Sequence, residues 1–193
     1  MTVRTSWADV TAQIAGCEKC RLCETRTNVV PGEGNPTADL MFIGEGPGQE
    51  EDRQGRPFVG RSGELLTSMI HAIGLERSEV YIANVVKCRP PGNRNPEPDE
   101  AEACLPYLRA QTALIRPRIV VLLGKVACTY VLRENVSVMR DHGRWYERKG
   151  VLFMPTFHPS ALLRDPSKKR EAWEDFKKIR DVLRGAEVPG GGE

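Results

Sequence analysis

The sequence lacks any long hydrophobic run. Its opening, MTVRTSWADV, does not contain the apolar core of a signal peptide, and no later segment has the length and hydrophobicity of a membrane span. We therefore expect no membrane partner and a cytoplasmic location. Cysteines stay reduced inside cells, so the six cysteines of this chain are more available to metals than to disulfides.

A large excess of charge of one sign is also missing. The 28 Lys and Arg residues nearly balance the 26 Asp and Glu residues, which leaves a formal net charge of +2. This balance excludes a polycation that binds nucleic acid everywhere. It does not exclude a local basic face, because the distribution of charge decides where phosphate binds. We expect a monomer.

Apolar runs alternate with amphipathic helical patterns along the chain. Buried strands are predicted at 39–44, 80–86, 119–123 and 151–157, with a hairpin segment at 144–149. Helices are predicted at 6–16, 65–73, 99–115, 124–133 and 166–185. The alternation predicts a single α/β domain over residues 1–185, a three-layer α/β/α fold with a mainly parallel central sheet of about four strands. Residues 186–193 are expected to form a flexible tail.

Four of the cysteines form two spaced pairs. Cys17 and Cys20 make a tight CxxC, whereas fifteen residues separate Cys88 from Cys104. A CxxC loop brings two thiolates together, and two further sulfurs complete a tetrahedral set. Two zinc knuckles would have a short gap in both pairs, so the wide second gap favours an iron–sulfur cluster over structural zinc. Buried reduced cysteines without a metal are the alternative.

The two remaining cysteines are interpreted differently. Cys128 stands in the apolar run 126–130, which is typical of a small core residue. Cys23 lies near the CxxC and could be a further ligand, but we interpret it as a bystander.

Three loops, at 44–60, 84–98 and 156–164, follow predicted strands. In parallel sheets, ligands bind off the carboxyl ends of the strands, so these loops should converge on one site. The first loop opens with GEGPG, whose glycines allow a close approach of backbone to a ligand. A phosphate cradle is disfavoured, because no Lys-Ser/Thr follows and acidic residues do. Glu45 beside exposed amides suits holding a water near a developing cation.

Three side chains of these loops suit a heterocyclic base. Phe58 lies among turn residues, either as a core plug or as a platform for a flat ring. Asn84 interrupts an apolar strand, where a buried amide must bond to the fold or to a ligand with a donor and an acceptor. His158 directly follows a strand and precedes Pro159, and we favour a functional role for it.

Three long motifs occur in order along the chain, with three shorter ones before the first strand. The long motifs are GEGPGQEEDRQGRPFVGRSGELL, NVVKCRPPGNRNPEPDE and FHPSALLR, and the short ones are CxxCRL, TRTNVV and GEGNP. In this ordered set the chain resembles family 4 uracil-DNA glycosylases, the iron–sulfur branch of the uracil-DNA glycosylase superfamily. The resemblance runs from about Cys17 to Arg184. It implies the fold of that superfamily and a monofunctional enzyme that flips uracil out of DNA and hydrolyses its N-glycosidic bond. The products would be free uracil and an abasic site, which initiates base excision repair.

The resemblance also implies roles for particular residues. A [4Fe–4S] cluster, mainly structural, would be held by Cys17, Cys20, Cys88 and Cys104. Phe58 would stack on uracil, Asn84 would read its amide edge, and His158 would bond its O2. Glu45 and Gly46 would place the hydrolytic water, which makes Glu45, Gly46 and His158 the catalytic set. The uracil-binding residues would be Glu45, Gly46, Pro47, Phe58, Asn84 and His158.

One departure from related proteins bears on the reaction. The related covalent uracil-DNA binders carry a GEQPG loop and a basic KRRIH insertion with a reactive His. The corresponding segments here are GEGPG and PPGNRNPEP, without a His. This departure favours turnover over covalent trapping.

The segment after His158 is the predicted contact with DNA. The candidates are Ser160, Leu163, Arg164 and Lys168, with Lys169 and Arg170 nearby, although an ordinary solvated helix face explains each basic residue equally well. Leu162 or Leu163 could fill the gap left by a flipped base or pack locally. The expected partner is uracil-containing DNA, single- or double-stranded, at the nucleoid. Two rival hypotheses are a non-catalytic binder of such DNA and an iron–sulfur electron carrier.

Overall fold

The computed structural model describes residues 6–188, and the structural statements below concern this part of the chain. Residues 1–5 of the predicted domain and residues 189–193 of the predicted tail lie outside it. Within the described part, no helix is both long and apolar enough to cross a membrane.

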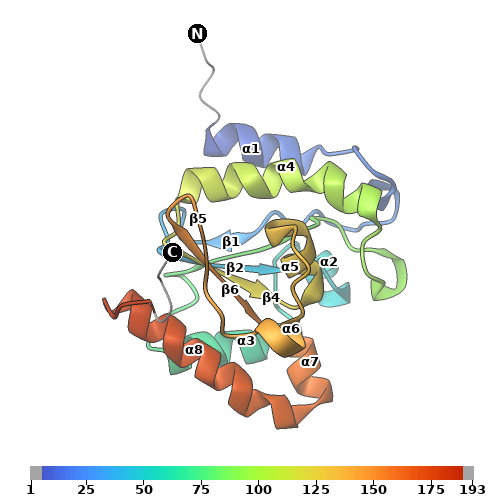
Figure 1. The fold of residues 1–193 in the computed structure, drawn as a ribbon. Coiled ribbons are helices and arrows are strands. Elements are labelled where there is room, and N and C mark those ends of the chain that lie inside the picture. The colour runs from blue at the N-terminus through green and yellow to red at the C-terminus, as the bar shows by residue number, and fades with distance from the viewer. Residues whose placement is uncertain (1–5, 189–193) are drawn as a thin grey trace.

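A six-stranded sheet forms the centre of the fold, in the order β1-β3-β2-β4-β6-β5 (Figure 1). Its four middle strands are parallel: β3 (Tyr81–Asn84), β2 (Leu40–Gly44), β4 (Ile119–Leu123) and β6 (Val151–Thr156). The short strands β1 (Glu33–Gly34) and β5 (Tyr146–Arg148) pair antiparallel at the two edges. The predicted fold class and the four parallel strands are confirmed. The sheet has six strands rather than about four, because two edge strands join the parallel ones: β5 lies in the predicted hairpin segment 144–149, and β1 has two residues, too few to produce a periodic pattern.

Helices cover both faces of the sheet (Figure 1). On one face lie α1 (Trp7–Ala15), α4 (Pro98–Ile115) and α5 (Lys125–Leu132), packed against residues such as Met41 and Ile43. On the other lie α3 (Arg61–Ala72) and α8 (Lys169–Leu183), packed against Leu40 and Phe42. Successive residues of β2 thus serve opposite cores. This explains why the strand is apolar throughout rather than alternating.

Short polar helices were missed in the predicted loops. They are α2 (Gln49–Gln54), α6 (Val138–Asp141) and α7 (Pro159–Arg164), together with the 3-10 turns η1 (Arg21–Glu24), η2 (Pro91–Asn93) and η3 (Pro166–Lys168). The segment 44–60 is therefore not a continuous loop. Its acidic run begins α2, where carboxylates are favourable beside the free N–H groups of a helix start.

Candidate functional site

A cavity of about 440 Å³ opens at the carboxyl ends of the parallel strands. The loops after β2, β3 and β6 supply its walls, as the sequence predicts. All six residues predicted to contact the base line it: Glu45, Gly46, Pro47, Phe58, Asn84 and His158. The ring centroids of Phe58 and His158 are 5.5 Å apart, so the two rings border the same space.

Asn84 presents a buried acceptor to this cavity. It is the last residue of β3, pairs in register with Gly44 of β2, and is 2% exposed. Its side-chain oxygen Oδ1 has no hydrogen-bond partner among residues 6–188. Buried acceptors are normally satisfied, so this oxygen calls for a donor from a bound molecule. A Cβ atom at Gly44 would lie 2.5 Å from Oδ1 and 2.6 Å from the Phe58 ring, so only glycine fits between them.

Phe58 is held in place through its backbone. Its φ of 50° is unusual for a residue with a bulky side chain. Arg77 stabilises this conformation by donating to the carbonyl oxygens of Pro57 and Phe58, the latter at 2.8 Å. Glu33 in turn accepts from Arg77 Nε at 2.9 Å. A side chain at Gly63 would overlap the Phe58 carbonyl, so this position in the first turn of α3 requires a glycine.

Glu51 of α2 joins the two loops on either side of that helix. One of its carboxylate oxygens accepts from the backbone N–H groups of Val59 at 2.9 Å and Gly60 at 3.0 Å. The other accepts from Gly48 N–H at 3.1 Å. The acidic residues after GEGPG disfavour a phosphate site, and one of them, Glu51, has a structural role, because it links the GEGPG loop to the Phe58 loop.

His158 is neutral and has a defined tautomer. Burial, aided by the positive charge of Arg164, lowers the pKa of the imidazole to about 4. The backbone N–H of Ser160 lies 3.1 Å from Nδ1, and a backbone N–H can only donate, so Nδ1 accepts. The ring proton is therefore on Nε2. Gly124 allows the close approach of this residue, since a Cβ there would lie 3.0 Å from that of His158.

Glu45 and Gly46 extend β2 into the cavity. The carbonyl of Glu45 accepts from Val86 N–H at 3.1 Å, which fixes the backbone of this turn. A Cβ at Gly46 would lie 2.7 Å from Val86 Cγ2, so a larger residue would displace the turn. Burial raises the pKa of the Glu45 carboxyl group, and Arg164 opposes the shift. A higher pKa makes this carboxylate a better proton acceptor.

The predicted DNA contacts divide into two groups. Ser160 and Arg164 line the cavity, and the Ser160 hydroxyl lies 2.7 Å from His158 Nδ1. Leu163 and Lys168 lie outside the lining, and the Lys168 ammonium pairs with Glu171 at 3.1 Å. Leu162 is 1% exposed and packs with Phe157 and Ala172, so it is a core residue and not a wedge.

Five cysteines surround a second, small cavity between the N-terminal segment and α4. They are Cys17, Cys20, Cys23, Cys88 and Cys104. Cys128 is fully buried in α5, which confirms the prediction that it is a core residue. Among residues 6–188, no three His, Cys, Asp or Glu side chains lie close enough to hold a single metal ion.

The surroundings of these sulfurs fit a thiolate-bound cluster. Arg26 Nη1 donates to Cys88 Sγ at 3.2 Å, and the backbone N–H of Lys87 donates to Cys104 Sγ at 3.3 Å. Hydrogen bonds of this kind tune and orient thiolate ligands. The Lys87 ammonium is buried and donates to the Asn84 carbonyl at 2.9 Å. One short stretch of chain thus borders both cavities.

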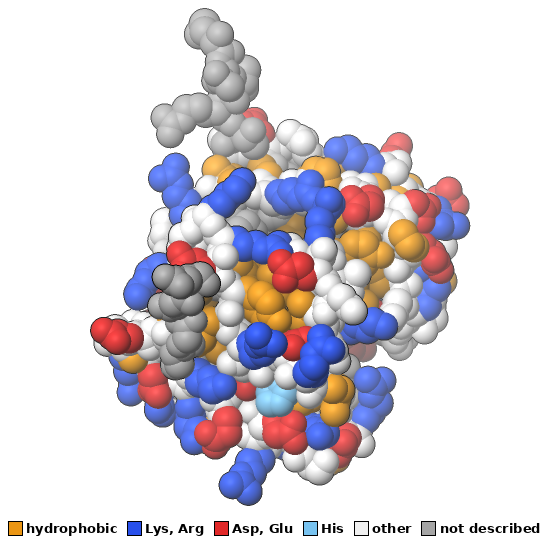
Figure 2. All heavy atoms as spheres, in the orientation of Figure 1, with side chains coloured by type: hydrophobic (Ala, Val, Ile, Leu, Met, Phe, Trp, Pro, Cys, Tyr) orange, Lys and Arg blue, Asp and Glu red, His pale blue; other side chains and the backbone are white. Residues whose placement is uncertain are grey.

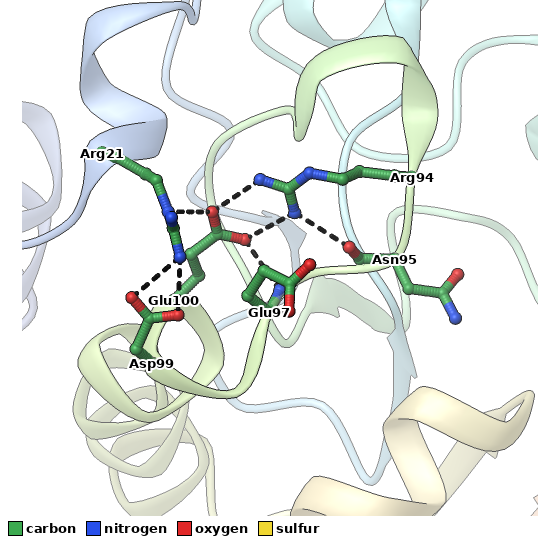
Figure 3. Close-up of polar contacts among 6 residues, drawn as sticks. All are labelled: Arg21, Arg94, Asn95, Glu97, Asp99 and Glu100. Atoms are coloured by element: carbon green, nitrogen blue, oxygen red, sulfur yellow. Dashed lines mark hydrogen bonds and ion pairs between the residues drawn. The ribbon is translucent and has the colours of Figure 1, made fainter.

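Glu100 links the cysteine segment to the lip of the first cavity (Figure 3). Its buried carboxylate accepts from Arg21 Nε at 2.9 Å, and from Arg94 at 2.7 and 2.8 Å. It also caps α4 by accepting from Glu97 N–H at 2.8 Å. Arg21 follows Cys20 directly, and Arg94 lines the cavity. These charge-assisted bonds lower the pKa of Glu100 to about 2.

This network predicts an acid-sensitive contribution to stability. The Glu100 pKa falls from 4.5 to about 2 on folding, so its stabilisation is complete above pH 4.5 and is lost as the pH falls toward 2. At pH 7, Glu100→Gln should lower the free energy of unfolding by about 3 kcal/mol. Denaturant unfolding of the unaltered protein and of Glu100→Gln between pH 7 and pH 3 tests this prediction. The difference between their free energies of unfolding should decrease only in the acidic part of the range. The control is Asp99→Asn, which removes an exposed partner of Arg21. An equal loss of stability in Asp99→Asn would contradict the role assigned to Glu100. A difference in free energy of unfolding that does not change with pH would contradict it as well.

Comparison with known proteins identifies the family. The family model described as the uracil DNA glycosylase superfamily matches residues 31–177. The chain belongs to the uracil-DNA glycosylase superfamily. A type-4 uracil-DNA glycosylase of Sulfurisphaera tokodaii is 50% identical, over 88% of this chain and 81% of the relative. Type-4 enzymes of Archaeoglobus fulgidus and Thermotoga maritima are 44% and 45% identical, over 90% and 91% of this chain and 92% and 93% of theirs.

Membership of the superfamily confirms the resemblance found in the motifs. The superfamily match starts at residue 31, after Cys17 and Cys20, so it does not itself include the first cysteine pair. Arg77 and Glu100, whose roles the sequence does not predict, do not line the cavity but hold loops that do: Arg77 bonds to the backbone of Phe58, and Glu100 pairs with Arg94. The one sequence feature that marks Glu51 is its place in the motif GEGPGQEEDRQGRPFVGRSGELL.

Proposed function

We propose that this protein is a uracil-DNA glycosylase, which hydrolyses the bond between uracil and deoxyribose in DNA. The observation that carries the proposal is the buried, unpartnered Oδ1 of Asn84 in a cavity that also contains Phe58 and a neutral His158. The N3–H group of uracil is the donor that such an oxygen requires. Relatives up to 50% identical that are named type-4 uracil-DNA glycosylases support the same activity.

The base must leave the helix to reach this cavity. A uracil stacked in a duplex is inaccessible, so the nucleotide rotates out, most easily when it is mispaired or single-stranded. The extruded ring stacks on Phe58, whose position Arg77 and Gly63 fix. Arg164, exposed at the mouth, and Ser160 and Leu163 of α7 are the proposed contacts with the flanking backbone, with Lys168 farther along.

His158 stabilises the leaving group. Breaking the N-glycosidic bond places negative charge on uracil, and the Nε2–H of neutral His158 donates to O2 as that charge develops. The donor is held by the Ser160 bond to Nδ1, so it needs no rearrangement during the reaction. One donor of this kind typically contributes about 3–4 kcal/mol to the transition state.

Glu45 and Gly46 place the attacking water. The sugar becomes cation-like as uracil departs, and the Glu45 carboxylate favours that charge while accepting a proton from water. Water is the nucleophile, so the reaction ends at an abasic site with the strand uncut. The enzyme would thus be a monofunctional glycosylase, and its reaction would be the first step of base excision repair. We also propose that the protein acts as a monomer on uracil-containing DNA, single- or double-stranded, and that it is associated with the nucleoid.

Cys17, Cys20, Cys88 and Cys104 would hold a [4Fe–4S] cluster at the cysteine cavity, and the bound cluster would cross-link the N-terminal segment, the loop after β3 and α4. Arg26 and the backbone N–H of Lys87, which donate to the sulfur atoms of Cys88 and Cys104, would support two of these ligands. Cys23 also lines the cavity and is the one candidate for an alternative ligand.

Base choice gives a specific prediction at Asn84. Cytosine lacks a hydrogen on N3 and carries an amino group in place of O4, which inverts the pattern that Asn84 reads. Asn84→Asp should slow uracil excision, because a carboxylate cannot donate to O4, while excision of cytosine becomes measurable. Single-turnover rates on matched uracil and cytosine oligonucleotides measure both effects. If a folded Asn84→Ala variant excises uracil at an unchanged rate, Asn84 does not take part in recognising the base.

The proposed activity is tested on three matched oligonucleotides, with U·G, U·A or single-stranded uracil at the same position. Abasic sites are revealed by strand breakage in hot alkali. We expect breakage at uracil in each, and none where thymine or cytosine replaces it. Binding without breakage in all three would leave a non-catalytic reader of uracil.

A further inference from the structure

A second large groove lies away from the proposed active site, between α4, α5 and the β5–β6 hairpin. Its volume is about 640 Å³. Its floor is apolar, from buried or partly buried residues of the sheet and both helices: Ile43, Leu105, Leu108, Val131, Val151 and Phe153. Figure 2 shows apolar side chains near the middle of this face, with Lys and Arg side chains above and below them and acidic side chains at their edge.

The charged side chains that line the groove are all basic. Four cationic residues line it, Arg109, Arg116, Arg118 and Lys149, and no Asp or Glu is found among its described lining residues. This contrasts with the near balance of 28 basic and 26 acidic residues in the whole chain. Among the described residues, one ion pair involves a charged residue of this lining, Arg118 with Asp39 at 3.9 Å, and both of its side chains are exposed.

The groove is also separate from the proposed active site. It borders Arg118 just before β4 and Val151 at the start of β6, whereas the 440 Å³ cavity borders Leu123 and Phe157 at the other ends of these strands. A molecule bound in the groove would therefore not block the 440 Å³ cavity of the proposed active site.

We propose that this groove is a docking site for an acidic peptide segment of a partner protein that carries aliphatic or aromatic side chains. An apolar floor takes such side chains out of water, and the four cations attract the flanking carboxylates. The four cations could also contact phosphates, but a nucleic acid fits less well, because the mainly aliphatic floor, in which Phe153 is only partly exposed, offers little surface on which bases can stack. The proposal does not depend on the glycosylase activity.

The test uses a short fluorescein-labelled peptide of Asp, Leu and Phe, with binding read by anisotropy. Two control peptides replace Asp by Lys, or Leu and Phe by Ser. We expect the first peptide to bind the full chain, and both controls to bind at least about tenfold more weakly. Arg109→Glu/Arg118→Glu should weaken binding by a similar factor. Arg170→Glu on α8, across the sheet, should not. Thermal midpoints of all variants confirm that they fold.

Several outcomes would overturn the proposal. One is no binding of the Asp-Leu-Phe peptide, and another is an equal loss in Arg170→Glu, which would indicate general charge attraction. Displacement of the peptide by a uracil-free oligonucleotide would make the groove a nucleic-acid surface. A dimer in sedimentation that Arg109→Glu/Arg118→Glu dissociates would make it an interface between copies of this chain.

Discussion

Replacing His158 with alanine should slow uracil excision roughly a hundredfold or more while DNA affinity changes little. The variant loses the Nε2–H donor that stabilises the departing uracil, an interaction that matters mainly in the transition state. Rates are measured with enzyme in excess, and affinity with a non-cleavable uracil analogue. His71→Ala is the matched control, since His71 is exposed at the end of α3.

The pH dependence sharpens this prediction. Since the pKa of His158 is lowered from 6.5 to about 4, the imidazole stays neutral throughout the neutral range. The His158-dependent part of the rate should therefore show no step near pH 6.5 and should fall only as the pH approaches 4. If His158→Ala loses binding and cleavage in equal proportion, the residue positions DNA instead. If neither changes, the site is misplaced.

Replacing Cys88 with serine should remove the iron and the brown colour expected of the protein, and with them most of its activity. Cys88 lies four residues after Asn84, and its loop continues to Arg94 at the lip of the cavity. Without the cluster, this loop loses its anchor to the N-terminal segment. Iron content, visible absorbance and single-turnover excision measure the three effects, with about four irons expected in the unaltered protein.

Two serine variants serve as controls for the cluster. Cys128→Ser should keep its iron, because Cys128 lies in α5 away from the cysteine cavity. Cys23→Ser should also keep it, although Cys23 lines that cavity. If Cys23→Ser loses its colour and Cys20→Ser keeps it, Cys23 rather than Cys20 is the cluster ligand. A colourless, active protein with one zinc would overturn the cluster altogether.

The sequence predicts those parts of the fold whose signals are local. The four parallel strands are continuous apolar runs. Glu45, Asn84 and His158 each stand at the carboxyl end of one of them, and the carboxyl ends of parallel strands lie on the same side of a sheet. The helices α2 and α7 were missed because each has six residues and lacks a long periodic apolar face.

The supporting contacts could not be predicted because they join distant parts of the chain. Arg21 and Glu100 are 79 residues apart in sequence, and Arg77 reaches Phe58 across 19. Nothing in the composition near Glu100 distinguishes it from exposed Asp99 beside it. Only packing makes one carboxylate a buried link and leaves the other in solvent.

The most direct test of the central claim counts the uracil molecules released per protein molecule, by mass spectrometry of the small-molecule fraction, with uracil-containing DNA in excess. We predict many free uracils per protein, an equal number of abasic sites, and DNA without attached protein. No free uracil would indicate a binding protein or an electron carrier. At most one product per protein, with the chain covalently joined to DNA, would indicate trapping and would contradict the mechanism proposed for Glu45, Gly46 and His158.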